Sequence, residues 1–490
     1  MKNRAIRICA IVFAAYLLFG ALFYPIAGDS LHFTQDSTDP VSNKGTLGEI
    51  TAGETVEQNF VCEFDEMQSL SVLVGTMARK NTDMIRAELF AAGNTEPIFT
   101  ADLNTADMKD NTLFEITFPQ TITNAKEKKF TLKLTSLAGV SGNAVTFYYG
   151  NTIDAGRVDA AVEIDDTEIL YSNGVQKTDG EDNPCLLCMK VTGINRHWFG
   201  TYYWFFYAGV AVLLVLYLVY LLYCEKRNKK SMALDVIHSL HKYSFLIRQL
   251  VARDFKTKYK RSVLGVFWSF LNPLLTMSIQ WVVFSTFFKS DIANYPIYLL
   301  CGIVCFNFFN EASSMCLMSI VGNAPLINKV YVPKYIYPFS RTLSSCINLL
   351  LSLVPLLIML IVTRTPITSA VLLLPFVLLM LFLLSYGMGL ILATLMVFFR
   401  DIQFLWGIFS MLLMYLTPIF YPETIIPERF MTVYKCNPLY HVLRFIRSIL
   451  IDGVSLEPKA YLYCFILCII PFIIGVLVFR KNQDKFVLNI

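Results

Sequence analysis

The sequence is poor in charge: only 16% of its 490 residues are Asp, Glu, Lys or Arg, while 55% are hydrophobic. In soluble globular proteins roughly a quarter of the residues are charged. The shortage therefore indicates a membrane protein. The charges are also unevenly placed, because residues 28–200 hold 26 acids and 13 bases, and the remainder holds 11 acids and 28 bases. An acidic block beside a basic, apolar remainder indicates two compartments and a membrane surface rather than a nucleic-acid partner.

The sequence also lacks signatures of catalysis. It holds no G-x-x-x-x-G-K-[ST] motif, the loop whose backbone amides cradle nucleotide phosphates, so this chain alone should not hydrolyse ATP. No pair of acids indicates a glycosidase dyad. The "CLLC" at 185–188 has zinc-like spacing, but no second Cys/His pair accompanies it. We therefore expect no catalytic residue, no metal and no cofactor in this chain.

The twelve cysteines do not predict a disulfide scaffold. Eight lie in or at the ends of apolar runs, where cysteine is usually a small hydrophobic residue. Cys185 and Cys188 fall in the acidic block, and if this block is outside the cell, a local disulfide between them is favoured over a metal site. An unpaired Cys62 argues against a fold built on disulfides.

Long apolar runs are what the sequence has in place of charge. About 20 apolar residues are needed to cross the hydrocarbon core as a helix. Eight such runs lie near residues 5–27, 202–224, 263–288, 295–320, 340–363, 369–398, 403–422 and 460–479. The first run follows three basic residues and could be a cleaved signal peptide, but its length favours a retained anchor.

Lys and Arg near the runs indicate the orientation. They gather before the first run, in 225–262, in 321–341 and after the last run, and residues 225–262 alone hold 11 bases and 3 acids. If every run crosses once, all four regions lie on one side, which the positive-inside rule makes cytoplasmic. Both termini are then cytoplasmic, and residues 28–200 are outside.

Residues 28–200 have the period of two that is typical of β-strands. Phe114, Ile116 and Phe118 of "LFEITFP" share one face, and "KFTLKLTSL" (129–137) alternates in the same way. Clusters of Gly, Asn and Asp separate these runs. The pattern predicts an antiparallel β-sandwich, for which a spacer or assembly role and glycan binding both stay open, because fold alone does not give function.

The expected fold is thus a mainly α-helical polytopic membrane protein with an extracytoplasmic antiparallel β-sandwich domain. A helical stripe at residues 243–251, followed by a basic end, predicts an amphipathic helix in the cytoplasmic interface. The expected parts are an anchor (1–27), the sandwich (28–200), a second span (201–224), the interface helix (225–262) and a larger membrane domain (263–490).

Four stretches of the membrane half carry a family resemblance. They are "LIRQLVARDFKTKYKRSVLGVFWSFLNPLL" (246–275), "GIVCFNFFNEASSMCLMSIVGNAPLINKVYVPKYIYPFSR" (302–341), "FFRDIQFLWGI" (398–408) and "TPIFYPETIIP...NPLYHVLRFIRSIL" (417–450). In this order they resemble permease subunits of type-2 ABC exporters, closest to those that export O-antigen and teichoic-acid polysaccharides. The resemblance covers roughly residues 240–490 and excludes the first run and the sandwich.

The resemblance implies a six-span permease in residues 263–490 that works with a separate ATPase. Two copies of the ATPase, which would bind ATP and Mg²⁺, usually join two permeases, so a homodimer is expected. The expected location is the bacterial cytoplasmic (inner) membrane, and the expected cargo is a lipid-linked polysaccharide.

In this family the loop between the second and third permease spans is a coupling helix that docks on the ATPase. Here that loop is "VGNAPLINKVYVPKYIYPFSR" (321–341), where Asn323 can cap a helix, Pro325 suits its first turn and Pro333 can end it. The expected coupling residues are Asn323, Leu326, Ile327, Lys329, Val330 and Lys334, with Arg400 and Asp401 as a second contact. An ordinary positive-inside loop, and an interfacial anchor at Arg400, are the alternatives.

The family also implies an aromatic-lined conduit for the glycan. The expected lining residues are Trp268, Phe306, Phe308, Phe309, Glu311 and Trp406. Aromatic residues also form interfacial belts and pack between helices, and this alternative stays open. Glu311 is an acid inside an apolar run, so it should face the conduit or pair with a neighbouring helix.

The segment 423–452 is too polar for an ordinary span, and in the family it forms short re-entrant gate helices on the outer side. The expected gate residues are Pro418, Tyr421, Pro422, Asn437, Pro438, Arg444 and Arg447. Because Arg444 and Arg447 lie three residues apart on one helical face, they could bind phosphate or anchor at lipid headgroups.

These observations predict the membrane-spanning permease subunit of an ABC transporter that exports a lipid-linked polysaccharide. Short outer loops at 289–294 and 364–368 favour this cargo over drugs or lipids, which remain the alternative within transport. A membrane glycosyltransferase is the alternative from another class, and it would need a catalytic acid such as Glu423 or Glu428.

Overall fold

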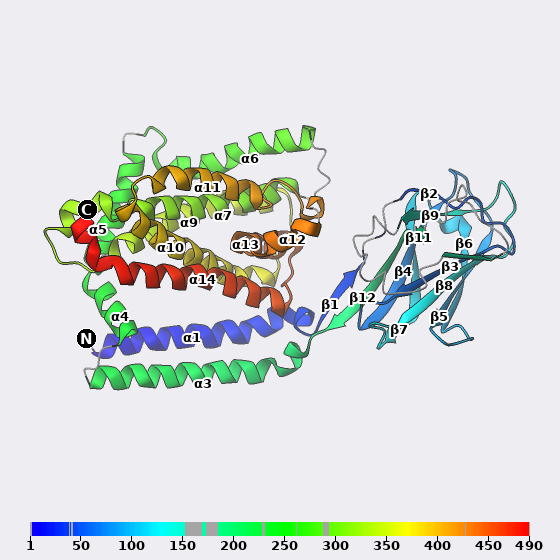
Figure 1. Cartoon of the computed structure of the whole chain (residues 1–490), viewed down its shortest axis with the longest axis horizontal. Helices are drawn as coiled ribbons and strands as arrows, with labels where there is room; N and C mark the ends of the chain where they lie inside the picture. The colour runs from blue at the N-terminus through cyan, green and yellow to red at the C-terminus, as the bar shows by residue number, and fades with distance from the viewer. Residues whose placement is uncertain are drawn as a thin grey trace. The chain divides into compact units, whose positions relative to one another are not determined.

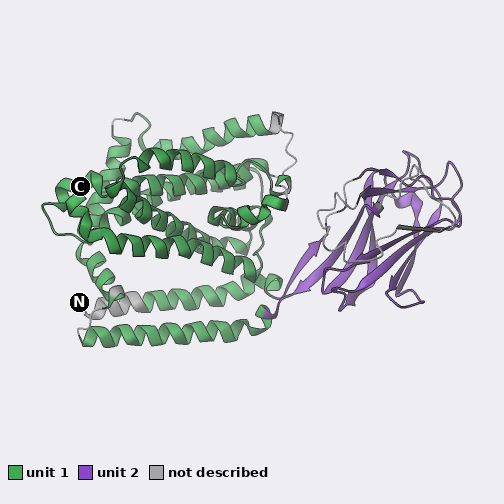
Figure 2. Ribbon diagram, in the orientation of Figure 1, with its two compact units in different colours: residues 1–31, 199–490 green, residues 32–198 purple. Residues whose placement is uncertain are grey.

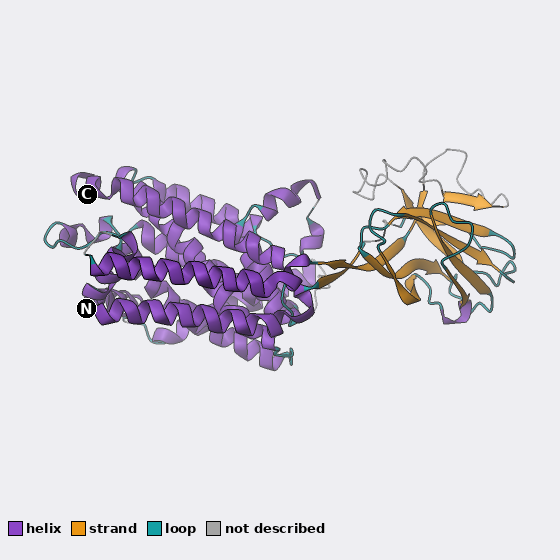
Figure 3. Ribbon diagram, turned by 90° about the horizontal axis from the view of Figure 1, so that it is seen from below, coloured by secondary structure: helices purple, strands orange, loops and turns teal. Residues whose placement is uncertain are grey.

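The computed structural model describes residues 2–38, 40, 43–151, 169–172, 185–227, 231–260, 262–287, 294–426 and 428–489. The chain forms two units, coloured separately in Figure 2. One combines Met1–Leu31 with Phe199–Ile490 and is helical. The other, His32–Trp198, is built mainly of strands, which Figure 3 shows in orange. Each unit has its own apolar core.

Within the described ranges, seven helices are long and apolar enough to cross a membrane. They are α1 (Lys2–Ala27), α3 (Trp198–Lys226), α6 (Trp268–Phe287), α7 (Tyr295–Leu317), α9 (Ile336–Val362), α10 (Leu374–Phe398) and α14 (Pro458–Asn482). Proline lies in the first turn of α7, α10 and α14, where no helical partner exists for its missing N–H. The prediction of a polytopic helical membrane protein is confirmed.

The eighth predicted span, 403–422, is shorter than the sequence indicated. Its helix, α11, runs over Ile402–Leu416 and has 15 residues. At 1.5 Å per residue it reaches about 22 Å, less than the roughly 30 Å of a hydrocarbon core. The helix ends because Thr417 precedes Pro418, and a residue before proline disfavours the helical conformation.

Figure 1 shows both chain ends at the same end of the helical unit, which we call the terminal end. Short elements gather there: α4 (Met232–Lys242), α5 (Ser244–Tyr259), η5 (Val321–Asn323), α8 (Ala324–Ile327), η9 (Gln483–Lys485) and α15 (Phe486–Asn489). Two further short helices, α12 (Glu428–Lys435) and α13 (Pro438–Arg447), lie toward the opposite end. A π-helical turn, Ser448–Asp452, follows α13.

The core of the helical unit is centred on α7 and α10. Side chains of α7, α9, α10, α13 and α14 form one large apolar cluster. Small residues allow α10 and α14 to approach closely: a Cβ on Gly387 would lie 2.3 Å from the Cα of Phe472. A Cβ on Gly475 would lie 2.3 Å from the Gly387 carbonyl oxygen. Such contacts are typical of packed membrane helices, where small residues let backbones meet.

Tyrosines hold α1 and α3 together. Tyr203 donates to the Gly20 carbonyl at 2.6 Å, Tyr207 to Leu17 at 2.8 Å, and Tyr16 to Tyr207 at 2.9 Å. On its other side α1 contacts the rest of the helical unit, with the ring of Phe23 packed edge-on against Tyr461. The two N-terminal helices are therefore joined to the main bundle through α1.

The second unit consists of two antiparallel sheets. Its strands are β1 (Phe33–Ser37), β2 (Gly45–Thr46), β3 (Thr55–Val61), β4 (Glu66–Gly75), β5 (Met84–Ala91), β6 (Phe99–Asn104), β7 (Thr112–Thr123), β8 (Lys129–Ser136), β9 (Thr146–Asn151), β10 (Ile169–Ser172), β11 (Cys185–Leu187) and β12 (Met189–Arg196). One sheet has the order β1-β12-β4-β9-β11, with β7 also on β4 and β2 on β9, and the other has the order β10-β3-β8-β5-β6.

Both sheets contribute to one core, so the predicted antiparallel β-sandwich is confirmed. Phe130, Leu132 and Leu134 of β8 are buried, and the residues between them are partly exposed, as the alternation predicts. Their partners across the core include Leu70 and Val72 of β4. The burial of alternate residues is what fixes which face of each strand points inward.

The predicted disulfide between Cys185 and Cys188 is wrong. Cys188 is a free, fully buried thiol in the sandwich core. The chain from β11 into β12 is extended, and three residues of extended chain span about 10 Å, too far for a disulfide. Burial raises the pKa of the Cys188 thiol to about 11, so it stays protonated near neutral pH.

Candidate functional site

The predicted docking loop between α7 and α9 is compact. It begins with η5 and continues as one turn of helix, α8, with Pro325 in its first turn. The helix ends at Ile327, well before Pro333, because Asn328 begins a turn rather than a second helical turn. A helix this short is unstable alone and depends on the residues it packs against.

Two sides of this loop have different environments. Leu326 and Ile327 pack against an apolar cluster at the terminal end, which includes Leu250 of α5 and Tyr337 of α9. The remaining side is exposed to solvent and forms what we call the docking strip: Pro325, Asn328, Lys329, Val330 and Tyr331. Tyr331 is 91% exposed and Val330 50% exposed, so apolar surface is presented next to a lysine.

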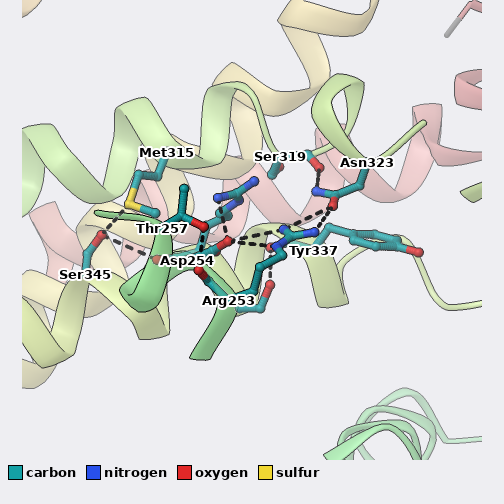
Figure 4. A network of polar contacts seen from close by, with 10 residues as sticks. Arg253, Asp254, Thr257, Met315, Ser319, Asn323, Tyr337 and Ser345 are labelled. Carbon is teal, nitrogen blue, oxygen red and sulfur yellow. Dashed lines mark hydrogen bonds and ion pairs between the residues drawn. The ribbon is translucent and has the colours of Figure 1, made fainter. Parts of the chain in front are cut away.

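The expected helix cap at Asn323 is absent. Its carboxamide nitrogen donates to the Ser319 carbonyl at 2.7 Å, and its oxygen accepts from the Arg253 guanidinium at 3.3 Å. Figure 4 shows this bridge from α5 to the loop. The side chain is therefore used for a tertiary contact, which sequence spacing could not reveal, and the capping prediction is wrong.

Asp254 ties α5 to α9 in the same network. Its Oδ1 lies 2.9 Å from Arg341 and 3.2 Å from Arg253, and only 3% of the side chain is exposed. Figure 4 shows Asp254 between Arg253 and the helices behind it. Among the described residues its second oxygen, Oδ2, has no hydrogen-bond partner. A buried carboxylate is tolerated here because two guanidinium groups face it.

Other predicted coupling residues lie at the terminal end in different settings. The Lys334 ammonium donates to the Gln483 carbonyl and lies near the ring of Phe486, so it binds the C-terminal segment of its own chain. Arg400 and Asp401 are exposed between α10 and α11. In the part of the chain that is described, neither forms an ion pair. The docking strip and this second pair are thus available to a partner, whereas Lys334 is engaged.

A cavity of about 970 Å³ lies among α5, α6, α7 and α9. Most of its lining residues have polar side chains, and five of them are charged, although apolar atoms make up much of the lining surface. The residues that line it include Arg253, Asp254, Lys258, Tyr259, Trp268, Ser269, Asn272, Asn307, Asn310, Glu311, Ser314, Arg341, Ser344, Asn348 and Ser352. Charged side chains within membrane helices are tolerated where they face the protein interior or water, as they do around this cavity.

The cavity wall follows helical spacing that the sequence shows but that our sequence reasoning missed. On α7, Asn310, Glu311 and Ser314 follow Asn307 by three, four and seven residues, which places all four on one helical face. Arg341, Ser344, Asn348 and Ser352 share one face of α9 in the same way. Such a stripe inside an apolar run indicates a wet interior face. Of this lining, sequence reasoning identified only Trp268 and Glu311.

Glu311 both lines the cavity and pairs with its neighbours, as expected for an acid within a span. Its Oε1 accepts from Lys258 of α5 at 2.8 Å and from Asn348 of α9 at 2.6 Å. Tyr259 extends the network by donating to the Asn348 side-chain oxygen at 3.0 Å. These bonds neutralise the carboxylate and link the interface helix to two spans.

The predicted aromatic path divides into two groups. Trp268 is half-exposed and lines the cavity. Phe306, Phe308, Phe309 and Trp406 are buried in the apolar core, and the indole N–H of Trp406 donates to Ser314 at 3.0 Å. Within this chain these four rings pack between helices, so their role as a lining stays a prediction.

The Arg447 side chain is buried among groups of its own chain. It is 7% exposed, and it donates to the carbonyls of Pro418 at 2.7 Å and Ile419 at 3.1 Å. Its guanidinium carbon lies 3.4 Å from the centre of the Tyr298 ring. Arg447 thus holds the chain turn after α11, and the expectation that it faces anions is wrong. Arg444, one turn earlier, is partly exposed.

The other predicted gate residues surround the same turn. Asn437 caps α13 by accepting from the Leu439 N–H at 3.0 Å, with Pro438 in the first turn, and it donates to Thr417. The carbonyl of Tyr421 accepts from Tyr298 at 2.7 Å, and Pro422 precedes a 3₁₀ turn at Glu423–Ile425. Glu423 accepts from Tyr440 at 2.9 Å. The Glu428 side chain lies outside the described residues.

Comparison with known proteins identifies relatives of part of the helical unit. Residues 246–451 match the sequence model of the family described as "ABC-2 type transporter". An O-antigen export system permease protein, RfbA, from Klebsiella pneumoniae is 29% identical over 242 residues, which cover 49% of this chain and 93% of that protein. RfbA of Myxococcus xanthus is 29% identical over 193 residues, covering 39% and 74%. The polysialic acid transport protein KpsM of Escherichia coli is 27% identical over 250 residues, covering 49% and 93%.

The matched range begins in α5 and ends in the π turn after α13, so it includes the docking loop, the cavity and the turn held by Arg447. It includes neither α1, α3 nor the sandwich. Residues 246–451 therefore form an ABC-2 type transporter domain, and over this part the chain resembles polysaccharide-export permeases.

Proposed function

We propose that this chain is the membrane subunit of an exporter that moves a lipid-linked cell-surface polysaccharide across the cytoplasmic membrane. The names of the relatives support this class of cargo, since they are O-antigen and polysialic acid exporters that match nearly their whole length. A single observation carries the transport mechanism: the docking strip, an exposed patch at the terminal end of a chain that has no phosphate-binding loop of its own.

The energy for transport comes from a separate ATPase that binds ATP and Mg²⁺. Its contact is the docking strip, where Val330 and Tyr331 offer apolar surface and Lys329 offers positive charge. Aromatic anchors flanked by charge are typical of residues that carry most of an interface's binding energy. A partner groove with an apolar floor and acidic rim would complement the strip. Arg400 and Asp401 supply a second contact at the same end.

Movement of the docking loop is passed on by side-chain contacts rather than by the short helix alone. Arg253 joins Asn323 to α5, and Asp254 joins α5 to Arg341 of α9. One helical turn further along α5, Lys258 binds Glu311 at the cavity. A shift of the loop by the ATPase would therefore displace α5 relative to α7 and α9.

The assembly we propose has two copies of this chain and two ATPase subunits. Its terminal end faces the cytoplasm, because the basic segments at 225–262 and 321–341 lie there. The sandwich, His32–Trp198, is then outside the cytoplasmic membrane, where a role in receiving the emerging glycan and a spacer role both fit. The chain itself is a transport subunit without enzymatic activity.

The experiment is deletion of the gene followed by analysis of surface and membrane glycans. We expect loss of one surface polysaccharide and accumulation of its lipid-linked form inside the cell, with restoration by the full-length gene. Unchanged surface polysaccharides together with increased sensitivity to a drug would favour the alternative of a drug or lipid exporter.

A further inference from the structure

A second cavity, of about 370 Å³, lies where α1 and α3 meet the first turns of α10 and α14. Nine of its twelve lining residues are Phe or Tyr, and the others are Gly20, Val210 and Pro458. The lining thus carries no charge, unlike that of the cavity among α5, α6, α7 and α9. Because α1 and α3 lie outside the range that matches the transporter family, the matched domain alone does not form this cavity.

The polar atoms of the lining side chains are already bonded within the chain. The hydroxyls of Tyr16, Tyr203 and Tyr207 donate to backbone carbonyls of α1 and α3 at 2.6–2.9 Å. The Tyr461 hydroxyl lies 2.8 Å from that of Ser455. Ring faces and aliphatic groups are what remains for a ligand, and they suit a hydrocarbon, which needs no hydrogen bond.

The cavity follows the long axis of α3. Its lining residues on this helix, which recur every three or four positions and share one face, are Phe199, Tyr203, Phe206 and Val210. Phe199 and Val210 are eleven residues apart, so at about 1.5 Å per residue this face is roughly 16 Å long. This length is about half of a hydrocarbon core of roughly 30 Å, and therefore matches the depth of one leaflet.

Groups typical of a membrane–water boundary mark one end of the cavity. Both α3 and α14 begin at that end, which lies opposite the terminal end (Figure 1). Tyr202 and Trp204, in the first two turns of α3, are 51% and 50% exposed, as in the aromatic belts of membrane proteins. Lys459 follows the lining residue Pro458 and is exposed, and within the described ranges it forms no ion pair. A cation is therefore available at headgroup depth beside a cavity that suits hydrocarbon.

We propose that this cavity binds one acyl chain of a phospholipid, from the leaflet at the end opposite the terminal end, with the phosphate near Lys459. The cavity volume is near the lower end for ligand pockets, which admits a single chain rather than a whole lipid. Van der Waals contacts with the rings hold the chain, and Lys459 meets the phosphate as a point charge. A helix of a second copy, about 10 Å wide, is too broad to enter. The bound lipid fills the seam between α1, α3 and the transporter domain, whichever cargo is exported.

Filling the cavity tests the proposal. Val210→Trp places a large ring in it, and Val212→Trp is the matched control, because Val212 is on the same helix and exposed but does not line the cavity. The probe is phosphatidylglycerol added to the purified full-length protein in detergent, with retained lipid counted by native mass spectrometry. The parent and Val212→Trp should each retain one more lipid per chain than Val210→Trp, whose affinity should be at least about tenfold lower.

The headgroup contact is tested separately. Lys459→Gln should weaken retention of phosphatidylglycerol about threefold, because one charge contact to the phosphate is lost. Lys435→Gln removes an exposed lysine of α12 at the same end and should change nothing. Equal retention by the two lysine variants would remove Lys459 from the site.

Three results with the tryptophan variants would overturn the proposal. Equal retention of phosphatidylglycerol by Val210→Trp and Val212→Trp would show that lipid contacts only the general surface. Preferential retention of a polyprenyl phosphate, lost in Val210→Trp, would assign the cavity to an isoprenoid chain. A smaller particle for Val210→Trp alone in size-exclusion chromatography would show that a second copy covers this face.

A photoreactive lipid tests the unaltered chain and does not depend on the folding of a variant. Phosphatidylglycerol with a diazirine in its acyl chain should label the lining residues of α1 and α3 at least about fivefold more than the exposed face of α11. That face (Phe404, Ile408 and Met411) is a control for general contact with lipid. Equal labelling of the two surfaces would refute a specific site.

Discussion

Single residues at the terminal end show how this protein holds charge at a membrane boundary. Asp254 has 3% of its side chain exposed and faces two guanidinium groups, and Glu311 shares a lysine and an amide. Each carboxylate comes with a partner from a different helix. The pairs therefore fix the positions of α5, α7 and α9 relative to one another, in addition to balancing charge.

Replacing Asp254 with alanine should strongly destabilise the helical unit. The change leaves Arg341 and Arg253 without their carboxylate, and breaking a buried ion pair costs about 3–5 kcal/mol. Thermal unfolding of the full-length protein in detergent measures this as a lower midpoint. Asp235→Ala on α4 is the control, because that carboxylate is exposed and should contribute little. Equal midpoints for the two variants would show that the pair does not hold the helices.

The sandwich should lose stability in acid through Glu49. Hydrogen bonds from Arg79 and from the Gly142 N–H hold the pKa of this carboxyl below its ordinary value. A carboxyl with a lowered pKa in the folded state stabilises the fold above its unfolded pKa, which is about 4.3 for Glu, and this contribution is lost as pH falls through the folded value. Asp102, bonded to Arg86, acts in the same direction.

Urea unfolding of residues 32–198 at pH 7, 4 and 3 checks this expectation. Stability should fall between pH 4 and pH 3, and Glu49→Gln should reduce the fall. Because Asp102 is exposed and Glu49 is partly exposed, solvent screening limits the effect. A pH dependence that is identical in Glu49→Gln and the parent would assign it to other groups.

At the scale of helices, the sequence predicts the spans but not the contacts between distant residues. Seven spans follow from length and apolarity, since a helix satisfies its own backbone in lipid. The early end of α11 could be predicted from Thr417–Pro418, and the polar stripe on α9 (Arg341, Ser344, Asn348 and Ser352) could be predicted from its helical spacing. The role of Asn323 could not be predicted in this way, because its partner Arg253 is 70 residues away in the sequence. The burial of Arg447 depends likewise on carbonyls exposed only when α11 ends and the chain turns back.

The docking strip should bind the ATPase through a few side chains. Tyr331→Ala and Lys329→Glu should each weaken association with the partner about tenfold or more, because they remove an exposed anchor or reverse its charge. Binding of the purified ATPase to the permease in detergent micelles measures this directly. Lys485→Glu makes the same change of charge at the terminal end outside the strip and should bind normally. If both lysine variants bind equally well, the strip is not the interface.

At the scale of the whole molecule, the transporter domain and the sandwich are separate units with separate cores. The matched family range covers 246–451 and stops short of the sandwich. Two added helices that both cross the membrane, as we propose for α1 and α3, would leave the orientation of the following spans unchanged. Charge supports this arrangement, because the sandwich is acidic and the terminal end is basic.

An epitope inserted at Gly93 should be accessible from outside in spheroplasts, while a fluorescent protein fused to the C-terminus should fluoresce inside. Gly93 lies in an exposed turn between β5 and β6, where an insertion disturbs no strand pairing. Antibody labelling of intact spheroplasts, with permeabilised cells as the reference, gives the result. Labelling only after permeabilisation would reverse the proposed orientation.

The two ends of the sandwich are neighbours, and so are the helices they join. Phe33 of β1 pairs with Arg196 of β12, and Tyr203 of α3 bonds to Gly20 of α1. A segment whose ends lie this close can be gained or lost in one genetic step without strain on what remains. Such a chain can acquire a new outward-facing domain over evolutionary time while its older transport machinery continues to work unchanged.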